Sequence, residues 1–374
     1  MDRPEGILKG VVIGLVAAWA MIHLRGASGC SPQVASGPLL PDGDGAIEEL
    51  VIQYEPGSTA IVSTAYRQFL SQLPAEVTVH VVCPDRAAFE DLLERVGPID
   101  VTLRPMIAGH PITTWSRDRW LALAPGAPDE PTTLLKSNDE DGAPVWPARA
   151  GDRRVAADLA EALDRVDWRR SFLRFDGGDF VADARAVMVG QWVLDKNPGL
   201  DEEDLRLGLA AGLGRDVLLL RGAPRHHAGM FVMTAGPGRV VVGDPALADP
   251  LLREIALPPV GVDASAATRT RFEAAARACR DAGYEVIRIP VVPGLDGRTY
   301  ITYTNVILDQ RAGRRLVYLP VYRGAEPLNR AAEQVWRELG FEVRRVDCTD
   351  AYTHFGSLRC LVNVLRRSAV NESV

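Results

Sequence analysis

Apolar residues in the chain recur in two alternating patterns, short β-rich runs and longer runs with helical spacing. The clearest series lies near the C-terminus. There the patterns predict strands at 300–309 and 315–321, a helix at 328–339 and a strand at 341–346. Gly340 follows the helix at the position where a left-handed cap favours glycine. The predicted order is therefore strand, strand, helix, strand.

The same ββαβ order recurs in three more copies and in one copy that is split between the two ends of the chain. The complete copies are predicted at 115–123, 132–136, 153–165 and 171–175; at 179–183, 186–189, 202–213 and 216–220; and at 230–234, 239–243, 267–282 and 284–290. The split copy comprises 47–53, helix 64–73 and 77–83, with strand 358–365 from the far end, and helix 86–96 and strand 101–104 extend it. Each unit needs neighbours to cover its exposed edges, so five units whose termini meet predict an α/β ring with pseudo-fivefold symmetry.

The composition is that of an ordinary globular protein. The 374 residues are 47% apolar, enough to bury the core of one large domain or two. A formal charge of −7 gives no general attraction to nucleic acid or to anionic lipid, and it suits a small cationic ligand. We therefore expect no nucleic-acid partner.

The N-terminal segment carries the features of an export signal. Arg3 and Lys9 flank an apolar stretch, 10–24, that is short for a membrane span and typical of a signal-peptide core. The following Ala27-Ser28-Gly29-Cys30 resembles a bacterial lipobox, which predicts lipidation at Cys30 and a membrane tether in the cell envelope. An uncleaved anchor and an ordinary signal peptide are alternatives.

The chain thus divides into three parts. Residues 1–45 form the signal-like segment and a linker, in which 31–45, rich in Pro, Gly, Ser and Asp, is predicted to be a tether. Residues 46–367 form the predicted catalytic domain, and 368–374 a C-terminal tail.

The cysteines fit neither a disulfide framework nor a CxxC metal site, and we expect neither a metal nor another cofactor. Cys83 and Cys279 lie in a predicted strand and helix and are interpreted as core thiols, and Cys348 is similar or could pair in an exported protein. Cys360 differs because it joins a recurring pattern. In each unit the first strand, or the turn that enters it, carries a reactive polar group: Asp118, Asp176 with Asp179, His227, Asn305 and Cys360.

Equivalent positions in a ring converge on its axis, so these residues could share one pocket, as nucleophilic catalysis requires. Each also has a simpler interpretation. Asp176-Gly-Gly-Asp179 could be only a tight turn, Asp118 an ion pair between two arginines, and Cys360 a core thiol. Their joint occurrence at equivalent places favours a site.

At these residues the chain resembles the pentein superfamily, whose members include agmatine, arginine and peptidylarginine deiminases and amidinotransferases. Trp115-Ser-Arg-Asp118 is similar to the family's Trp/Phe-x-Arg-Asp segment, Asp176-Gly-Gly-Asp179 to its acidic-Gly-Gly-Asp/Asn segment, and Gly356-Ser-Leu-Arg-Cys360 to its approach to the nucleophile. Tyr303-Thr-Asn-Val, followed by Val317-Tyr-Leu-Pro, is also similar to agmatine deiminase-like chains. The resemblance covers about residues 46–367 and implies the pentein α/β-propeller.

The resemblance implies a hydrolase that acts on a guanidino compound such as agmatine, arginine or peptidylarginine. Cys360 would be the nucleophile and His227 its acid/base partner, while Asp118 and Asp176 would orient the guanidinium. Trp115, Arg117, Asp179 and Asn305 would complete the substrate-binding set. An amidinotransferase, a catalytically silent guanidine-binding pentein and a thiol hydrolase on an unrelated α/β fold are the alternatives.

One position departs from the family pattern. Many deiminases carry His-x-Asp, whose Asp helps to hold the guanidinium, whereas His227-Ala-Gly229 offers glycine there. Two interpretations follow: Asp179 fills the gap, or the space beside Gly229 admits a substituted or peptide-bound guanidine. We expect such guanidines to be better substrates than free arginine.

Overall fold

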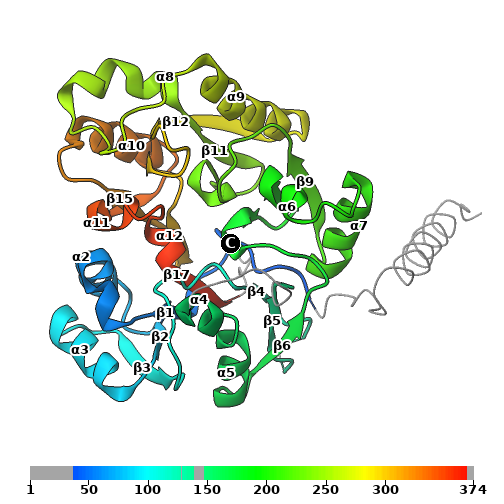
Figure 1. The fold of residues 1–374 in the computed structure, drawn as a ribbon, viewed down its shortest axis with the longest axis vertical. Helices are drawn as coiled ribbons and strands as arrows, with labels where there is room; N and C mark the ends of the chain where they lie inside the picture. The colour runs from blue at the N-terminus through cyan, green and yellow to red at the C-terminus, as the bar shows by residue number, and fades with distance from the viewer. Residues whose placement is uncertain (1–36, 128, 139–146, 369–374) are drawn as a thin grey trace, which may run out of the picture.

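The computed structural model describes residues 37–127, 129–138 and 147–368, and in this part of the chain five small sheets lie around the middle of the molecule (Figure 1). In each sheet the first strand pairs antiparallel with the second, and the second pairs parallel with the third. The predicted α/β class and ββαβ order are confirmed. The sheets, in strand order, are β17 (Val362–Arg367), β1 (Ile47–Gln53), β2 (Thr78–Cys83) and β3 (Thr102–Ile107); β4 (Trp120–Leu123), β5 (Thr132–Lys136) and β6 (Val166–Arg170); β7 (Phe180–Ala182), β8 (Ala186–Gly190) and β9 (Asp216–Leu220); β10 (Val232–Thr234), β11 (Arg239–Asp244), β12 (Glu285–Pro293) and β13 (Tyr300–Thr302); and β14 (Ile307–Arg311), β15 (Arg314–Val321) and β16 (Glu342–Asp347).

A helix connects the second and third strands of every sheet, as a parallel crossover requires. These helices are α2 (Thr59–Leu70), α5 (Val155–Ala162), α7 (Glu202–Leu213), α9 (Ala266–Asp281) and α10 (Glu326–Glu338). The shorter or additional helices are α3 (Arg86–Val96), α4 (Pro147–Asp152), α6 (Gln191–Lys196), α8 (Pro245–Ala248), α11 (Thr349–Tyr352) and α12 (Leu358–Leu361). The five connecting helices pack outside the sheets, whereas the short helices α4, α6 and α12 lie nearer the middle of the molecule, as do the turns that enter the first strands (Figure 1).

Neighbouring units meet through contacts in which at least one partner is the first strand of its unit. β4 contacts β17, β7 contacts β10, and β14 contacts β1. These strands are almost fully buried, as are the turns before β7, β10 and β17. The polar residues in those turns are therefore held by hydrogen bonds inside the protein, which fixes their positions.

Most predicted bounds differ from the structure by a few residues, and strand 115–123 begins only at Trp120 because 115–119 form a loop. Three further elements differ in place or kind. The last strand of the second copy is β6 at Val166–Arg170 and not 171–175, because α5 ends at Ala162 and the chain becomes extended at once. The predicted strand 300–309 changes partners midway: β13 pairs with β12, β14 pairs with β15, and residues 303–306 leave both sheets. Residues 358–361 form the helical turn α12 and not the start of a strand, since Asn305 Oδ1 accepts the backbone N–H of Arg359 at 2.9 Å.

The segment predicted as a tether is folded against the domain wherever the structure describes it. Leu39 is buried and bridges to Leu123, and Asp42 accepts hydrogen bonds from the side chain of Arg359 and the backbone N–H of Ala182. Residues 37–45 therefore belong to the folded unit and not to a linker. The export signal and the lipidation site Cys30 lie outside the described residues, as does the tail beyond Ser368.

None of the helices in the described ranges has the length and apolar character needed to cross a membrane.

Candidate functional site

Cys360 lies in α12, one turn before β17, and is 3% exposed. Its Sγ is 3.6 Å from Oδ1 of Asn305, which is itself almost fully buried. Asn305 also binds the backbone N–H of Arg359 and donates from Nδ2 to the carbonyl of Gly229 at 3.2 Å. Asn305 thus ties the cysteine turn to the turn that carries His227.

The other described cysteines are core residues. Cys83, Cys279 and Cys348 are free thiols inside the apolar core, and burial raises the pKa of Cys83 and of Cys279 to about 12 and that of Cys348 still further. A thiol with so high a pKa is a poor nucleophile. The prediction that Cys83 and Cys279 are structural is confirmed, and Cys348 is of the same kind.

The loop between β3 and β4 is fastened to the cysteine segment. The backbone N–H of Arg117 donates to the carbonyl of Cys360 at 3.3 Å, and the Ser116 hydroxyl donates to that of Leu361 at 3.0 Å. The Arg117 guanidinium donates to Asn363 Oδ1 at 2.8 Å and to the carbonyl of Gly177 at 3.1 Å. These bonds join three segments and place Asp118 close to the turn before β7. Contact of Arg117 with a substrate stays a prediction.

His227 stands between the two predicted guanidinium-binding carboxylates. Its Nδ1 is 4.0 Å from Asp118 Oδ1, and its Nε2 is 3.5 Å from Asp176 Oδ2. The ring packs on Gly178, where an added Cβ would lie 2.5 Å from Nδ1, so only glycine fits there. The structure therefore brings together an imidazole and two carboxylates from three turns that are far apart in the sequence.

The charge on His227 follows from these neighbours. Burial opposes protonation, but the hydrogen bonds with Asp176 and Cys360 and the charges of Asp118 and Asp179 raise the pKa of His227 well above its ordinary value. The adjacent His226 behaves oppositely, because burial and the neighbouring His227 charge lower its pKa to about 3. The low pKa keeps His226 neutral, and its Nδ1 accepts the backbone N–H of His227 at 2.7 Å; the role of His227 as proton carrier stays a prediction.

Asp176 is held by several groups at once. Lys196, at the end of α6, donates to Asp176 Oδ2 at 2.8 Å and to Asp179 Oδ2 at 2.6 Å, and Arg119 lies 3.7 Å from Asp176 Oδ1. Asp179 is fully buried and also accepts the backbone N–H of Asp176 at 2.9 Å. Burial would raise the pKa of Asp176, yet Lys196 and His227 hold it well below its ordinary value. The Oδ2 of Asp179 is bound by Lys196, whereas its Oδ1 is buried without a hydrogen-bond partner among the described residues, so the interpretation that Asp179 fills the gap at Gly229 stays a prediction.

Asp118 is bound by an arginine, whereas Asp176 is bound by a lysine. Its Oδ2 accepts a hydrogen bond from Arg149, which projects from the six-residue helix α4. Its Oδ1, which faces His227 Nδ1, has no hydrogen-bond partner among the described residues, and neither has that Nδ1. One half of this buried carboxylate is therefore occupied and the other half is unsatisfied.

The space beside Gly229 is filled by the chain itself. A Cβ on Gly229 would lie 2.8 Å from Nη1 of Arg359 and 3.4 Å from Nδ2 of Asn305. Arg359 is held there by Asp42 Oδ1, at 3.0 and 2.8 Å, and by the carbonyl of Phe180 at 2.7 Å. The expectation that glycine leaves room for a larger guanidine is wrong at this position, because a buried guanidinium occupies that room.

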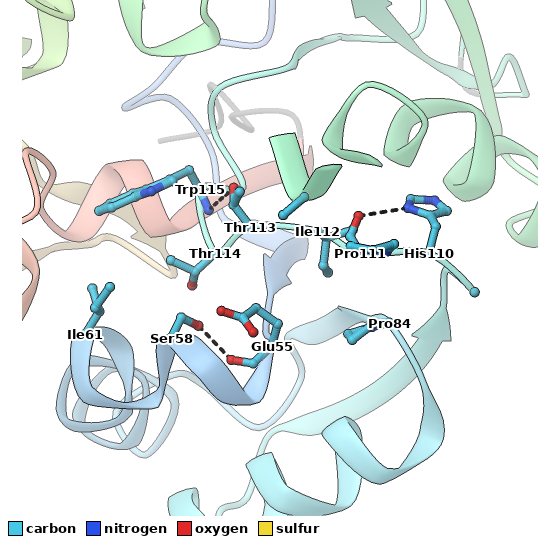
Figure 2. A pocket seen from close by; sticks show the side chains of 12 residues that line it. Glu55, Ser58, Ile61, Pro84, His110, Pro111, Ile112, Thr113, Thr114 and Trp115 are labelled. Carbon is cyan, nitrogen blue, oxygen red and sulfur yellow. Dashed lines mark hydrogen bonds between the residues drawn. The ribbon is translucent and has the colours of Figure 1, made fainter. Parts of the chain in front are cut away.

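Trp115 borders both the catalytic turns and a separate pocket. Its indole packs on Gly356, which precedes Cys360 by four residues, and an added Cβ there would lie 2.3 Å from the ring. The pocket, of about 520 Å³, is shown in Figure 2. It opens between the start of α2 and the loop before Trp115, and its lining includes Glu55, Thr114, Trp115 and Ala148.

The fold places the chain in a known structural class. No protein-family model matches the sequence and no curated protein matches it. Among solved structures, agmatine deiminase from C. jejuni superposes with a TM-score of 0.66 over 89% of this chain and 97% of that chain, at 13% identity. Agmatine deiminase of Enterococcus faecalis gives a TM-score of 0.66 over 87% and 95%, at 16% identity. A variant of the C. jejuni enzyme with substrate bound gives 0.65 over 89% and 97%, at 12% identity. The chain has the pentein fold, as the resemblance implied.

Some groups of the site were not predicted from the sequence. Arg149, Lys196 and Arg359 supply its cations, and Trp192 packs near His227 with ring centroids 6.3 Å apart. Only Arg359 had a sequence signal, because it directly precedes the proposed nucleophile and is charged where the site lacks an expected carboxylate. Arg149 and Lys196 lie on short helices whose polar residues follow no distinctive pattern.

Proposed function

We propose that the protein is a deiminase-type hydrolase that converts a guanidino compound to a ureido product and ammonia through a covalent adduct on Cys360. The observation that carries this proposal is the convergence of Cys360, His227, Asp118 and Asp176 from four separate turns. The pentein fold, shared with two agmatine deiminases, supports the same reaction class.

The first half of the reaction forms the adduct. A guanidinium carbon is a weak electrophile, so carboxylates must orient the cation and a thiolate must attack it. The Cys360 thiolate would form a C–S bond, and the tetrahedral carbon would then expel one nitrogen as ammonia. His227, protonated because its pKa is raised, would give that nitrogen its proton. The product of this step is an S-linked thiouronium on Cys360.

The second half releases the product. His227, now neutral, would accept a proton from a water molecule that attacks the thiouronium carbon. The carbon–sulfur bond then breaks, the thiolate is restored and the urea leaves. An amine in place of this water would give amidine transfer, which is the closest alternative reaction.

The expected substrate is a guanidine whose tail lies away from Cys360, His227 and the two aspartates. The described lining of the pocket beside Trp115 includes no lysine or arginine, and Glu55 supplies a carboxylate there. A tail that enters this pocket would be neutral or cationic, as in agmatine or a peptide-linked arginine, and an α-carboxylate would be disfavoured. Agmatine and peptidylarginine are therefore preferred to free arginine.

The test is ammonia and ureido product release from agmatine, a peptidylarginine and arginine, with Cys360→Ser as the deficient variant. Serine is close in size but far less nucleophilic at neutral pH, so we expect turnover to fall by at least about 10³-fold while the folded state is retained. Cys348→Ser is the matched control and should keep its activity, provided that it folds. Turnover that survives in Cys360→Ser would refute the assignment of the nucleophile, and binding without any turnover of the wild type would indicate a silent guanidine-binding protein.

A further inference from the structure

The predicted guanidinium-binding carboxylate Asp118 already binds a guanidinium that belongs to the chain. Arg149 donates from Nη2 to Asp118 Oδ2, and its side chain is 14% exposed while that of Asp118 is 6% exposed. The two groups form a charge-assisted pair of the same chemistry as the pair that an arginine-like ligand would form with Asp118.

Arg149 approaches from an anchored but very short element. α4 is fixed at its end by Asp152, which accepts hydrogen bonds from the backbone N–H of Thr113 at 2.7 Å, from its hydroxyl at 2.6 Å and from Gln53 Nε2 at 3.0 Å. Arg149 also reaches Asp152 Oδ2 at 3.3 Å. If Arg149 left Asp118, its charge would still have Asp152 nearby, so release of Asp118 would not strand a buried cation.

The free half of Asp118 points into the catalytic centre. Oδ1 of Asp118 is buried without a hydrogen-bond partner among the described residues and lies 4.0 Å from His227 Nδ1. A guanidinium ligand binds a carboxylate best through two parallel N–H bonds, one to each oxygen. Only Oδ1 is open to it while Arg149 holds Oδ2.

We propose that Arg149 is a specificity-determining residue that competes with cationic ligands for Asp118. A guanidinium or amidinium gains Asp118 only when Arg149 is released, so its binding is weakened by the loss of that ion pair. A neutral ligand that does not use Asp118 is not weakened. Arg149 therefore reduces the difference in affinity between a cationic ligand and a neutral ligand of the same shape. This inference rests on the proposed site but not on completed turnover.

The experiment measures the labelling of Cys360 by chloroacetamidine, a cation, and by chloroacetamide, its neutral counterpart of nearly equal size. Rate constants for modification of Cys360 are followed by peptide mass spectrometry for the wild type and for Arg149→Gln. We expect the ratio of the cationic to the neutral rate constant to rise by about tenfold in Arg149→Gln, because the amidinium no longer displaces a partner of Asp118. Arg154→Gln removes one positive charge from an exposed site that adjoins α4 and is the matched control for a general change in potential.

The outcomes separate this inference from the proposed function. A raised ratio in Arg149→Gln, with Arg154→Gln unchanged, supports competition even if agmatine is not turned over. An unchanged ratio, a lowered ratio or an equal rise in both variants overturns it, since Arg149 would then be neutral toward ligands, a support for Asp118, or one charge among many. Calorimetry of agmatine binding to Cys360→Ser, with and without Arg149→Gln, is a second measurement that needs no labelling, and tighter binding in the double variant is the supporting result.

Discussion

The two carboxylates beside His227 have similar positions but different surroundings. Asp176 is bound by Lys196, which also binds the fully buried Asp179, and its backbone N–H is bound to Asp179 as well. Asp118 forms an ion pair with Arg149, lies 4.0 Å from His227 and keeps one oxygen without a hydrogen-bond partner among the described residues. Asp176 thus lies in a network with Lys196, Asp179 and His227, in which Asp179 Oδ1 has no hydrogen-bond partner among the described residues, and Asp118 has one of its own oxygens left for a ligand.

This difference divides the work of the site. On the proposed function, Asp176 would orient and charge His227, whereas Asp118, with an open oxygen, would accept an N–H from a substrate. The pairing with Lys196 and Arg149 also balances much of the negative charge of the two aspartates. On the proposal made above, a cationic ligand would gain Asp118 by exchange with Arg149 and would not depend on a large net negative field.

Asp176→Asn gives the largest expected effect on catalysis. The amide keeps the shape but loses the charge that holds the proton on His227, so we expect kcat to fall by about 10²–10⁴-fold with little change in KM. Steady-state ammonia release from agmatine measures both constants. Asp195→Asn, on the same helix as Lys196, is the matched control and should leave both unchanged. A rise in KM at constant kcat would instead assign Asp176 to substrate binding.

Asp118→Asn should raise KM, and the size of this rise should depend on Arg149. In the wild type the ligand must displace Arg149 from Asp118. Loss of Asp118 removes the bond between the ligand and Asp118 but also the cost of displacing Arg149, so KM should rise only a few-fold. In the Arg149→Gln background the ligand binds Asp118 without displacing an arginine. Loss of Asp118 then removes only a favourable bond, and KM should rise by roughly 10–100-fold, as expected for a charge-assisted bond of about 1.5–3 kcal/mol. The four proteins form a double-mutant cycle. Equal effects of Asp118→Asn in both backgrounds would show that the two partners do not compete.

The sequence was sufficient to predict the class of fold and the residues that converge. The polar groups Asp118, Asp176, His227, Asn305 and Cys360 all lie in or next to the first strand of a unit, and a repeat places such positions together whatever the exact strand boundaries are. The boundaries themselves failed where pairing partners change. The apolar run 300–309 is continuous in sequence, but β13 and β14 belong to different sheets, and the break between them is what frees Asn305 to meet Cys360.

The charge balance of the site could not be predicted in the same way. Arg149, Lys196 and Arg359 reach the centre through long side chains whose direction depends on tertiary packing, and spacing along the chain says nothing about it. Asp42 shows the same limit, because residues 31–45 have the composition of a linker. In its described part, 37–45, Asp42 binds the buried Arg359, Leu39 fills a core position, and backbone hydrogen bonds add further contacts that hold this part on the domain.

The smallest expected effect is on the pH dependence of the free energy of unfolding, which tests the interaction between Asp176 and His227 directly. The pKa of His227 is raised in the folded state, so its stabilising contribution is complete below about 6.5, the value in an unfolded chain, and is lost as the pH rises through the folded pKa. The pKa of Asp176 is lowered, so its contribution is present above about 3.9 and is lost as the pH falls through the folded pKa. The difference in free energy of unfolding between the wild type and Asp176→Asn should therefore be largest between these two limits and shrink on either side.

Urea unfolding across this pH range measures the difference. Asp118→Asn should change the same profile less, because the nearest oxygen of Asp118 is 4.0 Å from His227, whereas that of Asp176 is 3.5 Å away. A larger change in Asp118→Asn would mean that Asp118, and not Asp176, keeps the proton on His227, and the division of work between the two carboxylates would be reversed.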